Sequence, residues 1–254
     1  MVRGPQSRDA IVLTVSRAVT HDTSPTFSRA PSLVAIPGGR FRMGARDGRP
    51  DEAPVHEVEV GAFLLGRTPV TRAEYAPFLA DTGTAPPPWW SDPAFADGAQ
   101  PVVGVTWFDA VAFTEWLGQA WGGAWRLPTE AEWERAARGG LAEAETAWGP
   151  TLPPGEVPTG RLAAPWPVGR GTANGYGLHD LTTIVHEWCL DWYAEAFYTV
   201  APERDPRGPE EGERRASRGG SWRHHVRWST PAARSSLPPS FRYADYGFRV
   251  LRET

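Results

Sequence analysis

The chain has 254 residues, of which 41% are hydrophobic and 22% charged, a composition typical of a soluble globular protein rather than a disordered one. Its net charge is −4 and it contains no long basic run, so nucleic-acid binding is not expected. The 27 glycines, 26 prolines and 13 tryptophans indicate a loop-rich fold held together by large aromatic side chains.

The N-terminal segment, residues 1–32, is rich in Ser, Thr, Arg and Pro and shows no sustained hydrophobic period. We expect a weakly ordered tail with at most one short strand at 10–16. Its apolar run at 10–15 is too short for a signal-peptide core or a membrane span. The single cysteine, Cys189, is typical of a reducing compartment. We therefore expect a cytoplasmic protein with one domain over residues 33–254.

Two stretches near the start of this domain have the patterns of strands. In 33–44 an apolar run meets a Pro-Gly-Gly turn signal and then alternates with arginines, which predicts a hairpin. In 56–71 His and Glu alternate with valines, which predicts another strand.

Three helices are predicted next, beginning near residues 71, 106 and 129 and ending at glycines 83, 122 and 139. The first and third open with a Thr-x-x-Glu capping box. No helix is expected beyond residue 145, where short apolar pieces alternate with Gly, Pro and Asn. This layout predicts an α+β domain with a small antiparallel sheet, about three helices and many loops.

The most specific signal is a set of seven segments in a fixed order: "IPGGRFRMG" (36–44), "PVHEVEVGAFLLGRTPVTRAEYAPFL" (54–79), "PVVGVTWFDAVAFTEWL" (101–117), "WRLPTEAEWERAARGG" (125–140), "NGYGLHDLTTIVHEWCLDWY" (174–193), "RGGSW" (218–222) and "GFRV" (247–250). In order and spacing they resemble the formylglycine-generating enzyme family, also called sulfatase-modifying factors. The resemblance implies a C-type-lectin-like core with long loops and bound calcium. The family includes copper oxidases that make formylglycine, domains of iron-dependent sulfoxide synthases, a pyoverdine-maturation enzyme and ligand-binding proteins without chemistry, so the fold does not settle the function.

The chain departs from the copper oxidases where they carry two cysteines after the Arg-Gly-Gly-Ser turn. Aligned from that turn, the two positions hold His224 and Ser229. A copper(I) site of two thiolates needs two cysteines, so formylglycine generation by that mechanism is not expected. The His-x3-His-x-Glu set of the sulfoxide synthases is also missing from the sequence.

A second departure places a histidine, His186, where the copper oxidases have an aromatic residue close to the metal. Together with His224 and a carboxylate it would form the two-histidine, one-carboxylate set of non-haem iron enzymes, and copper is the other candidate. The carboxylate is left open between Asp245 and Glu195. His225 is expected to face away from its neighbour, because adjacent residues of an extended loop point to opposite sides. The alternative is that these histidines are ordinary polar loop residues.

The resemblance also implies a structural calcium site. Its ligands would be the carboxylates of Asp180 and Glu187 with backbone oxygens of Thr183 and Val185, an oxygen set that suits calcium. The alternative is that the two carboxylates cap turns or pair with arginines such as Arg249. A second calcium site of some relatives is expected to be missing, since its motif is not found around 150–165.

The C-terminal loops form the ligand surface in relatives, and here they contain Arg227, Trp228, Arg234 and Tyr246. Arginines there could bind a carboxylate or phosphate, with Trp228 stacking on the ligand; the alternative is a packing role, which we favour for Trp222.

We therefore expect a metal-dependent oxidase or oxygenase that uses molecular oxygen on a small amino-acid-like or carboxylate-bearing metabolite. The second hypothesis is a binding module without chemistry, and a weaker third is an inactive relative that regulates a partner. The oligomeric state is not predicted.

Overall fold

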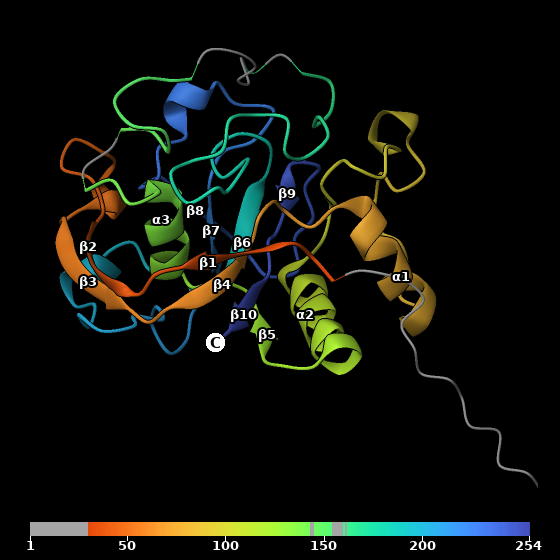
Figure 1. Ribbon diagram of the computed structural model, residues 1–254, viewed down its shortest axis with the longest axis horizontal. Coiled ribbons are helices and arrows are strands. Elements are labelled where there is room, and N and C mark those ends of the chain that lie inside the picture. Colours follow the sequence, from red (N-terminus) through yellow and green to blue (C-terminus); the bar gives the residue numbers. More distant parts are fainter. Residues whose placement is uncertain (1–29, 143–144, 154–159, 161) are drawn as a thin grey trace, which may run out of the picture.

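The computed structural model describes residues 30–142, 145–153, 160 and 162–254, coloured along the chain in Figure 1. Most of the expected tail, and the strand expected at 10–16, lie outside the described residues. The α-helices are α1 (Arg72–Thr82), α2 (Trp107–Trp121) and α3 (Glu130–Arg138). The strands are β1 (Leu33–Ile36), β2 (Gly39–Met43), β3 (His56–Val60), β4 (Phe63–Gly66), β5 (Trp125–Arg126), β6 (His186–Trp192), β7 (Arg215–Arg218), β8 (Arg234–Leu237), β9 (Tyr246–Gly247) and β10 (Leu251–Glu253). The expected α+β architecture is confirmed.

The three predicted helices form because each begins with a residue that satisfies the free backbone N–H groups of its first turn. Thr71, Thr106 and Thr129 each accept a bond from the backbone three residues on, and the acidic residue there bonds back. Glycines at the three C-caps have positive φ, which a residue without a Cβ adopts at little cost. No α-helix follows residue 145 in the described part of the chain, as expected.

The hairpin predicted within 33–44 is wrong, because its two strands belong to different sheets. β1 pairs with β4, whereas β2 pairs with β3. The first sheet has the order β1-β4-β10-β5 and the second consists of β2 and β3. Both halves of the predicted hairpin are strands, but each finds its partner in residues 56–66.

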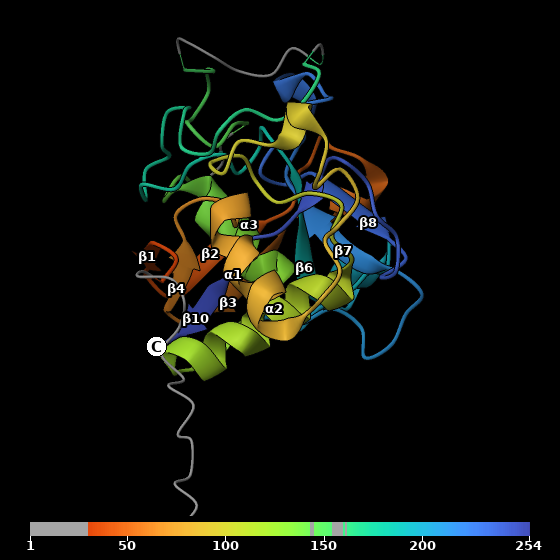
Figure 2. The ribbon, with the colours of Figure 1, turned by 90° about the vertical axis from the view of Figure 1, so that its right-hand side faces the viewer.

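The third sheet positions the candidate site. Its order is β8-β7-β6-β9, with antiparallel neighbours except for β6 and β9, which run parallel. The small antiparallel sheet of the sequence prediction is therefore three small sheets with one parallel pair. Figures 1 and 2 both show long loops gathered at one end of the molecule, at the top of each view.

The core is built from aromatic side chains, as the tryptophan content predicted. Around α1 and α2, Tyr75 stacks on Phe113 with ring centroids 5.3 Å apart, and Phe248 meets Phe113 edge-on at 5.5 Å. Trp133 and Trp188 are fully buried, in α3 and β6. Within the described residues, no helix has the length and apolar character that crossing a membrane requires.

Candidate metal centre

His186 and Asp245 are brought together by the parallel pairing of β6 and β9. The register places His186, the first residue of β6, opposite Tyr246, the first residue of β9. Asp245 immediately precedes that position, and its carbonyl oxygen accepts the backbone N–H of His186 at 2.8 Å. Two side chains 59 positions apart in the sequence thus share one end of the sheet.

His224 reaches the same place from the turn that follows β7. A Cβ on Gly219, where φ is +82°, would lie 2.4 Å from the carbonyl oxygen of Leu181, so this close approach of two backbones requires glycine. Beyond the turn, the backbone N–H of His224 donates to the carbonyl of Ser221 at 2.9 Å. The rings of His186 and His224 meet edge to face with centroids 5.1 Å apart.

His186, His224 and Asp245 offer one ligand atom each, all within 4.8 Å of one another. Ligands of one first-row metal ion, each at about 2.1 Å, lie about 3 to 4 Å apart. The outer limit of 4.8 Å exceeds this spacing, so the side chains would move closer to bind one ion; of the three, His224 is the exposed one. His186 and Asp245 are buried, at 8% and 7% exposed.

The nitrogen Nδ1 of His186 is buried and has no hydrogen-bond partner. A buried polar atom without a partner carries a desolvation cost of about 1–3 kcal/mol. A metal ion beside it would remove that cost, so the residues present fit a metal site. Burial lowers the pKa of His186 to about 4, against the opposing effect of the Asp245 carboxylate. The ring is therefore neutral at pH 7, which is the form that binds a metal.

Ser221, which the sequence analysis did not single out, fixes the carboxylate of Asp245. Its hydroxyl donates to Asp245 Oδ2 at 3.0 Å, and both residues are buried. This bond restricts the rotation of the carboxylate and does not involve Oδ1. The position of Ser221 in the "RGGSW" turn, three residues before His224, was the signal that could have identified it.

The structure separates the other candidates from this group. Of the two candidate carboxylates, Asp245 lies with the histidines. Glu195 is exposed, and its backbone carbonyl oxygen accepts a hydrogen bond from Arg234. The ring of His225 caps the short 3-10 helix Val226–Trp228 by accepting the backbone N–H of Arg227 at 3.3 Å. His225 is thus engaged away from the group, as expected.

Two residues of the expected ligand wall lie inside the protein instead. Arg234 is 2% exposed and forms a buried ion pair with Glu130, Nη2 to Oε2 at 2.8 Å. Tyr246 is 6% exposed, and its hydroxyl bonds Ser235 at 3.0 Å while its ring lies 5.0 Å from that of His186. Arg234 thus has a structural role in a buried ion pair, and Tyr246 packs against the His186 ring of the candidate metal site.

Arg227 and Trp228 lie on the surface, where a ligand could reach them. Trp228 is 69% exposed, and the guanidinium of Arg227 lies 4.7 Å from the centre of its ring. Trp222, by contrast, is 5% exposed and packs in the core, in agreement with the role expected for it.

The two carboxylates of the expected calcium site already have partners in the protein. Both oxygens of Glu187 are occupied by Arg249, at 2.6 and 2.7 Å, and one also accepts the indole N–H of Trp133 at 2.6 Å. Asp180 accepts the backbone N–H of Gly169 at 2.6 Å, and its other oxygen is buried without a partner. The arginine pairing named as the alternative thus holds for Glu187, and the calcium site stays a prediction.

Thr183 and Val185 lie between these two carboxylates, and both are buried. Residues 154–159, where part of the second calcium motif was sought, lie outside the described residues.

The chain is similar to known proteins in both sequence and structure. Residues 19–254 match the sulfatase-modifying factor enzyme 1-like domain. The formylglycine-generating enzyme of Streptomyces coelicolor is 35% identical over 87% of this chain and 88% of its own length. Among solved structures, PvdO from Pseudomonas aeruginosa superimposes with a TM-score of 0.76 at 28% identity, covering 88% of this chain and 95% of PvdO. Treponema denticola variable protein 1 also reaches 0.76, at 26% identity, covering 87% of this chain and 95% of that protein.

Proposed function

Since the chain belongs to the sulfatase-modifying factor family, we propose that it is a metal-dependent oxidase or oxygenase acting on a small amino-acid-like or carboxylate-bearing metabolite. The observation that carries the proposal is the group of His186, His224 and Asp245. Within this group, the buried Nδ1 of His186 has no hydrogen-bond partner. Two neutral imidazoles and one carboxylate suit iron(II), and copper is the second candidate.

The ligand set argues against the copper-thiolate chemistry of formylglycine generation. The only cysteine of the sequence, Cys189, is fully buried in β6. A site of two thiolates cannot be made from one cysteine. Redox chemistry in this chain would therefore depend on nitrogen and oxygen ligands.

The residues of this chain have separate tasks in the proposed reaction. The two histidines and Asp245 would hold the ion, which when bound supplies activation of molecular oxygen. Ser221 would keep the carboxylate in place, since outer hydrogen bonds orient metal ligands. Tyr246 and the buried side of the sheet would exclude water from behind His186.

The positive charge of residues 214–244, the segment that carries His224, supports an anionic substrate. Residues 214–244 contain seven arginines and neither Asp nor Glu. Within the described residues Arg223 and Arg227 have no carboxylate partner, and each lies over a tryptophan ring. An arginine in this state is ready to bind a carboxylate through paired hydrogen bonds, and Trp228 offers a flat apolar surface beside it. The proposed partners are thus this metabolite and oxygen, and the proposed location is the cytoplasm, which the single cysteine supports.

The second candidate function is a binding module without chemistry. It is favoured by the likeness to Treponema denticola variable protein 1 and by the exposure of Trp228, since tryptophan is enriched at protein interfaces. In this case His224 would contact a ligand directly and no redox metal would be retained.

Metal analysis of protein purified without a histidine tag separates the two functions. We expect about one iron or copper per chain in the wild type, a loss of at least about tenfold in His224→Ala, and no loss in His225→Ala, which has the same chemistry one residue away. Calcium alone, or no metal, in all three proteins would favour the binding module. Equal iron in all three would place the ion elsewhere.

A further inference from the structure

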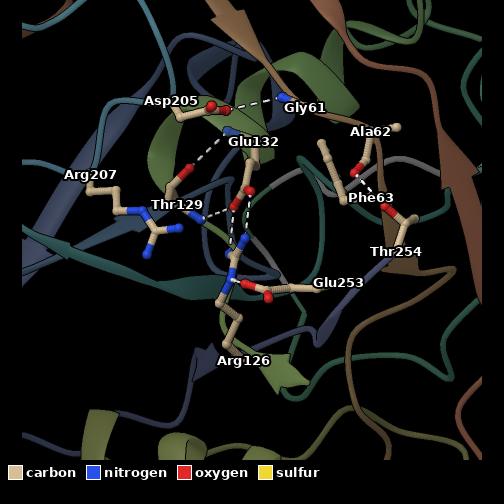
Figure 3. A pocket seen from close by; sticks show the side chains of 10 residues that line it. All are labelled: Gly61, Ala62, Phe63, Arg126, Thr129, Glu132, Asp205, Arg207, Glu253 and Thr254. Carbon is tan, nitrogen blue, oxygen red and sulfur yellow. Dashed lines mark hydrogen bonds and ion pairs between the residues drawn. The ribbon is translucent and has the colours of Figure 1, made fainter. Parts of the chain in front are cut away.

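A second cavity, of about 240 Å³, lies far from the metal centre in the fold. Its walls come from the connection between β3 and β4, from β5 and the start of α3, from the loop after residue 204 and from β10 (Figure 3). In Figure 1 these elements meet at the lower side of the molecule, whereas β9 and the start of β6 lie toward the upper loops. Half-open and mostly polar, it differs from the packed core around it.

One wall of this cavity carries an excess of negative charge. Arg126 binds Glu132 through two parallel bonds of 2.7 Å and Glu253 through its Nε at 2.8 Å. One guanidinium therefore faces two carboxylates, which leaves a net charge of −1 on the triple. Arg126 holds the pKa of Glu253 below its usual range, so that carboxylate is ionised at neutral pH. Glu253 is half-exposed and has one oxygen outside the bond to Arg126.

The loop of the opposite wall carries the cation of Arg207, which does not reach those carboxylates, and the carboxylate of Asp205. Arg207 lies at the cavity, and within the described residues no hydrogen bond or ion pair joins its side chain to the protein (Figure 3). Its positive charge acts on the other wall only through space, by helping to lower the pKa of Glu253.

The loop that carries Arg207 is fixed on both sides. Asp205 adopts a positive φ of 43°, its carboxylate accepts the backbone N–H of Gly61 at 3.0 Å, and its own N–H donates to the carbonyl of Glu59 at 2.8 Å. On the other side, a Cβ on Gly208 would lie 2.6 Å from the carbonyl oxygen of Trp192. The loop is therefore anchored by hydrogen bonds two residues before Arg207 and packs closely one residue after it.

We propose that this cavity binds a free α-amino acid. The carboxylate of the ligand would pair with Arg207, and its ammonium group would face Glu253 and the free oxygen of Asp205. Because Arg207 is the one cation of the lining without an ion pair within the described residues, and Glu253 and Asp205 each have an oxygen outside their bonds, a ligand with one group of each sign matches the cavity better than a simple anion does. The cavity volume of about 240 Å³ accommodates a free amino acid and does not restrict the size of its side chain, so alanine serves as a simple probe.

The test measures binding of L-alanine to the full chain by ligand-observed NMR, with acetate and methylamine as one-charge probes. We expect L-alanine to bind with a dissociation constant near the millimolar range, acetate and methylamine to bind at least about tenfold more weakly, and Arg207→Ala to weaken L-alanine by at least about tenfold. The matched control is Arg204→Ala, an exposed arginine of the same loop that lies outside the cavity.

Three results would overturn the proposal: no L-alanine binding by the wild type, equal binding of acetate, or unchanged affinity in Arg207→Ala. His224→Ala separates this site from the metal centre. Retained L-alanine binding in His224→Ala supports a second site, and its loss would show that the amino acid binds at the metal centre instead. Glu253→Gln should weaken binding while leaving the fold intact, because the amide keeps the shape of the side chain and its contact with Arg126.

Discussion

At the scale of single residues, burial separates side chains of the same type into different roles. Arg227 and Arg234 both lie in the C-terminal loops that the sequence analysis assigned to ligand binding. Arg234 is buried against Glu130, whereas Arg227 is exposed over Trp228. The sequence could not distinguish them, because the strand β8 that buries Arg234 depends on pairing with β7.

The bond from Ser221 to Asp245 predicts a positioning role for this serine. Removing the hydroxyl in Ser221→Ala frees the carboxylate to rotate, so we expect the affinity for iron(II) to fall by about 10- to 100-fold. Titration of metal-free protein with iron(II) under nitrogen measures it, with Ser240→Ala, an exposed serine of a nearby loop, as the control. Equal affinities in the two variants would show that Ser221 only shapes the turn.

At the scale of elements, local signals were sufficient for helices and insufficient for strand pairing. Capping boxes and C-cap glycines lie within a few residues of the helix they delimit, so the sequence predicted α1, α2 and α3 closely. The hairpin expected at 33–44 was wrong, because the choice of partner strand depends on residues 56–66 and on the core that both sheets cover.

The helix α3 is tied to the third sheet by buried ion pairs rather than by apolar contacts alone. Glu130 binds Arg234 at 2.8 Å and Arg218 at 3.3 Å, while Glu134 binds Arg218 and Arg138. These arginines hold the pKa of Glu130 below its ordinary value of 4.5 in spite of complete burial.

We therefore expect Glu130→Gln to lower the free energy of unfolding by about 3–5 kcal/mol at pH 7, because buried Arg234 loses its carboxylate partner and buried Arg218 loses one of its two. A carboxylate whose folded pKa lies below 4.5 stabilises the protein above that pH, and this contribution is lost as the pH falls toward the folded value. The difference between wild type and variant should thus shrink below about pH 4.5 in urea titrations. A difference that is constant with pH, or matched by the exposed Glu115→Gln, would contradict this account.

At the scale of the whole molecule, the fold could be predicted from the sequence far better than the site. The seven motifs predicted the family and the α+β architecture, which the comparisons confirm. The convergence of His186 and His224 could be suggested only from the resemblance, and the choice of Asp245 over Glu195 depended on the parallel pairing of β6 and β9. That pairing joins two-residue β9 to a distant strand, and so short a strand leaves no periodic signal.

The position of Cys189 makes its thiol a probe of how the molecule opens. The side chain is fully buried between the sheets and α3, and burial raises the pKa of the thiol well above its ordinary value. A thiol reagent needs both access and the thiolate, so labelling requires an opening that separates β6 from the core. We expect the folded protein to react with an aromatic disulfide reagent at least about a hundredfold more slowly than the protein in 6 M urea, a ratio that corresponds to about 2.7 kcal/mol of opening free energy. Glu130→Gln should react faster than the wild type if α3 and the sheet open as one unit, whereas fast labelling of the folded wild type would show that β6 opens on its own.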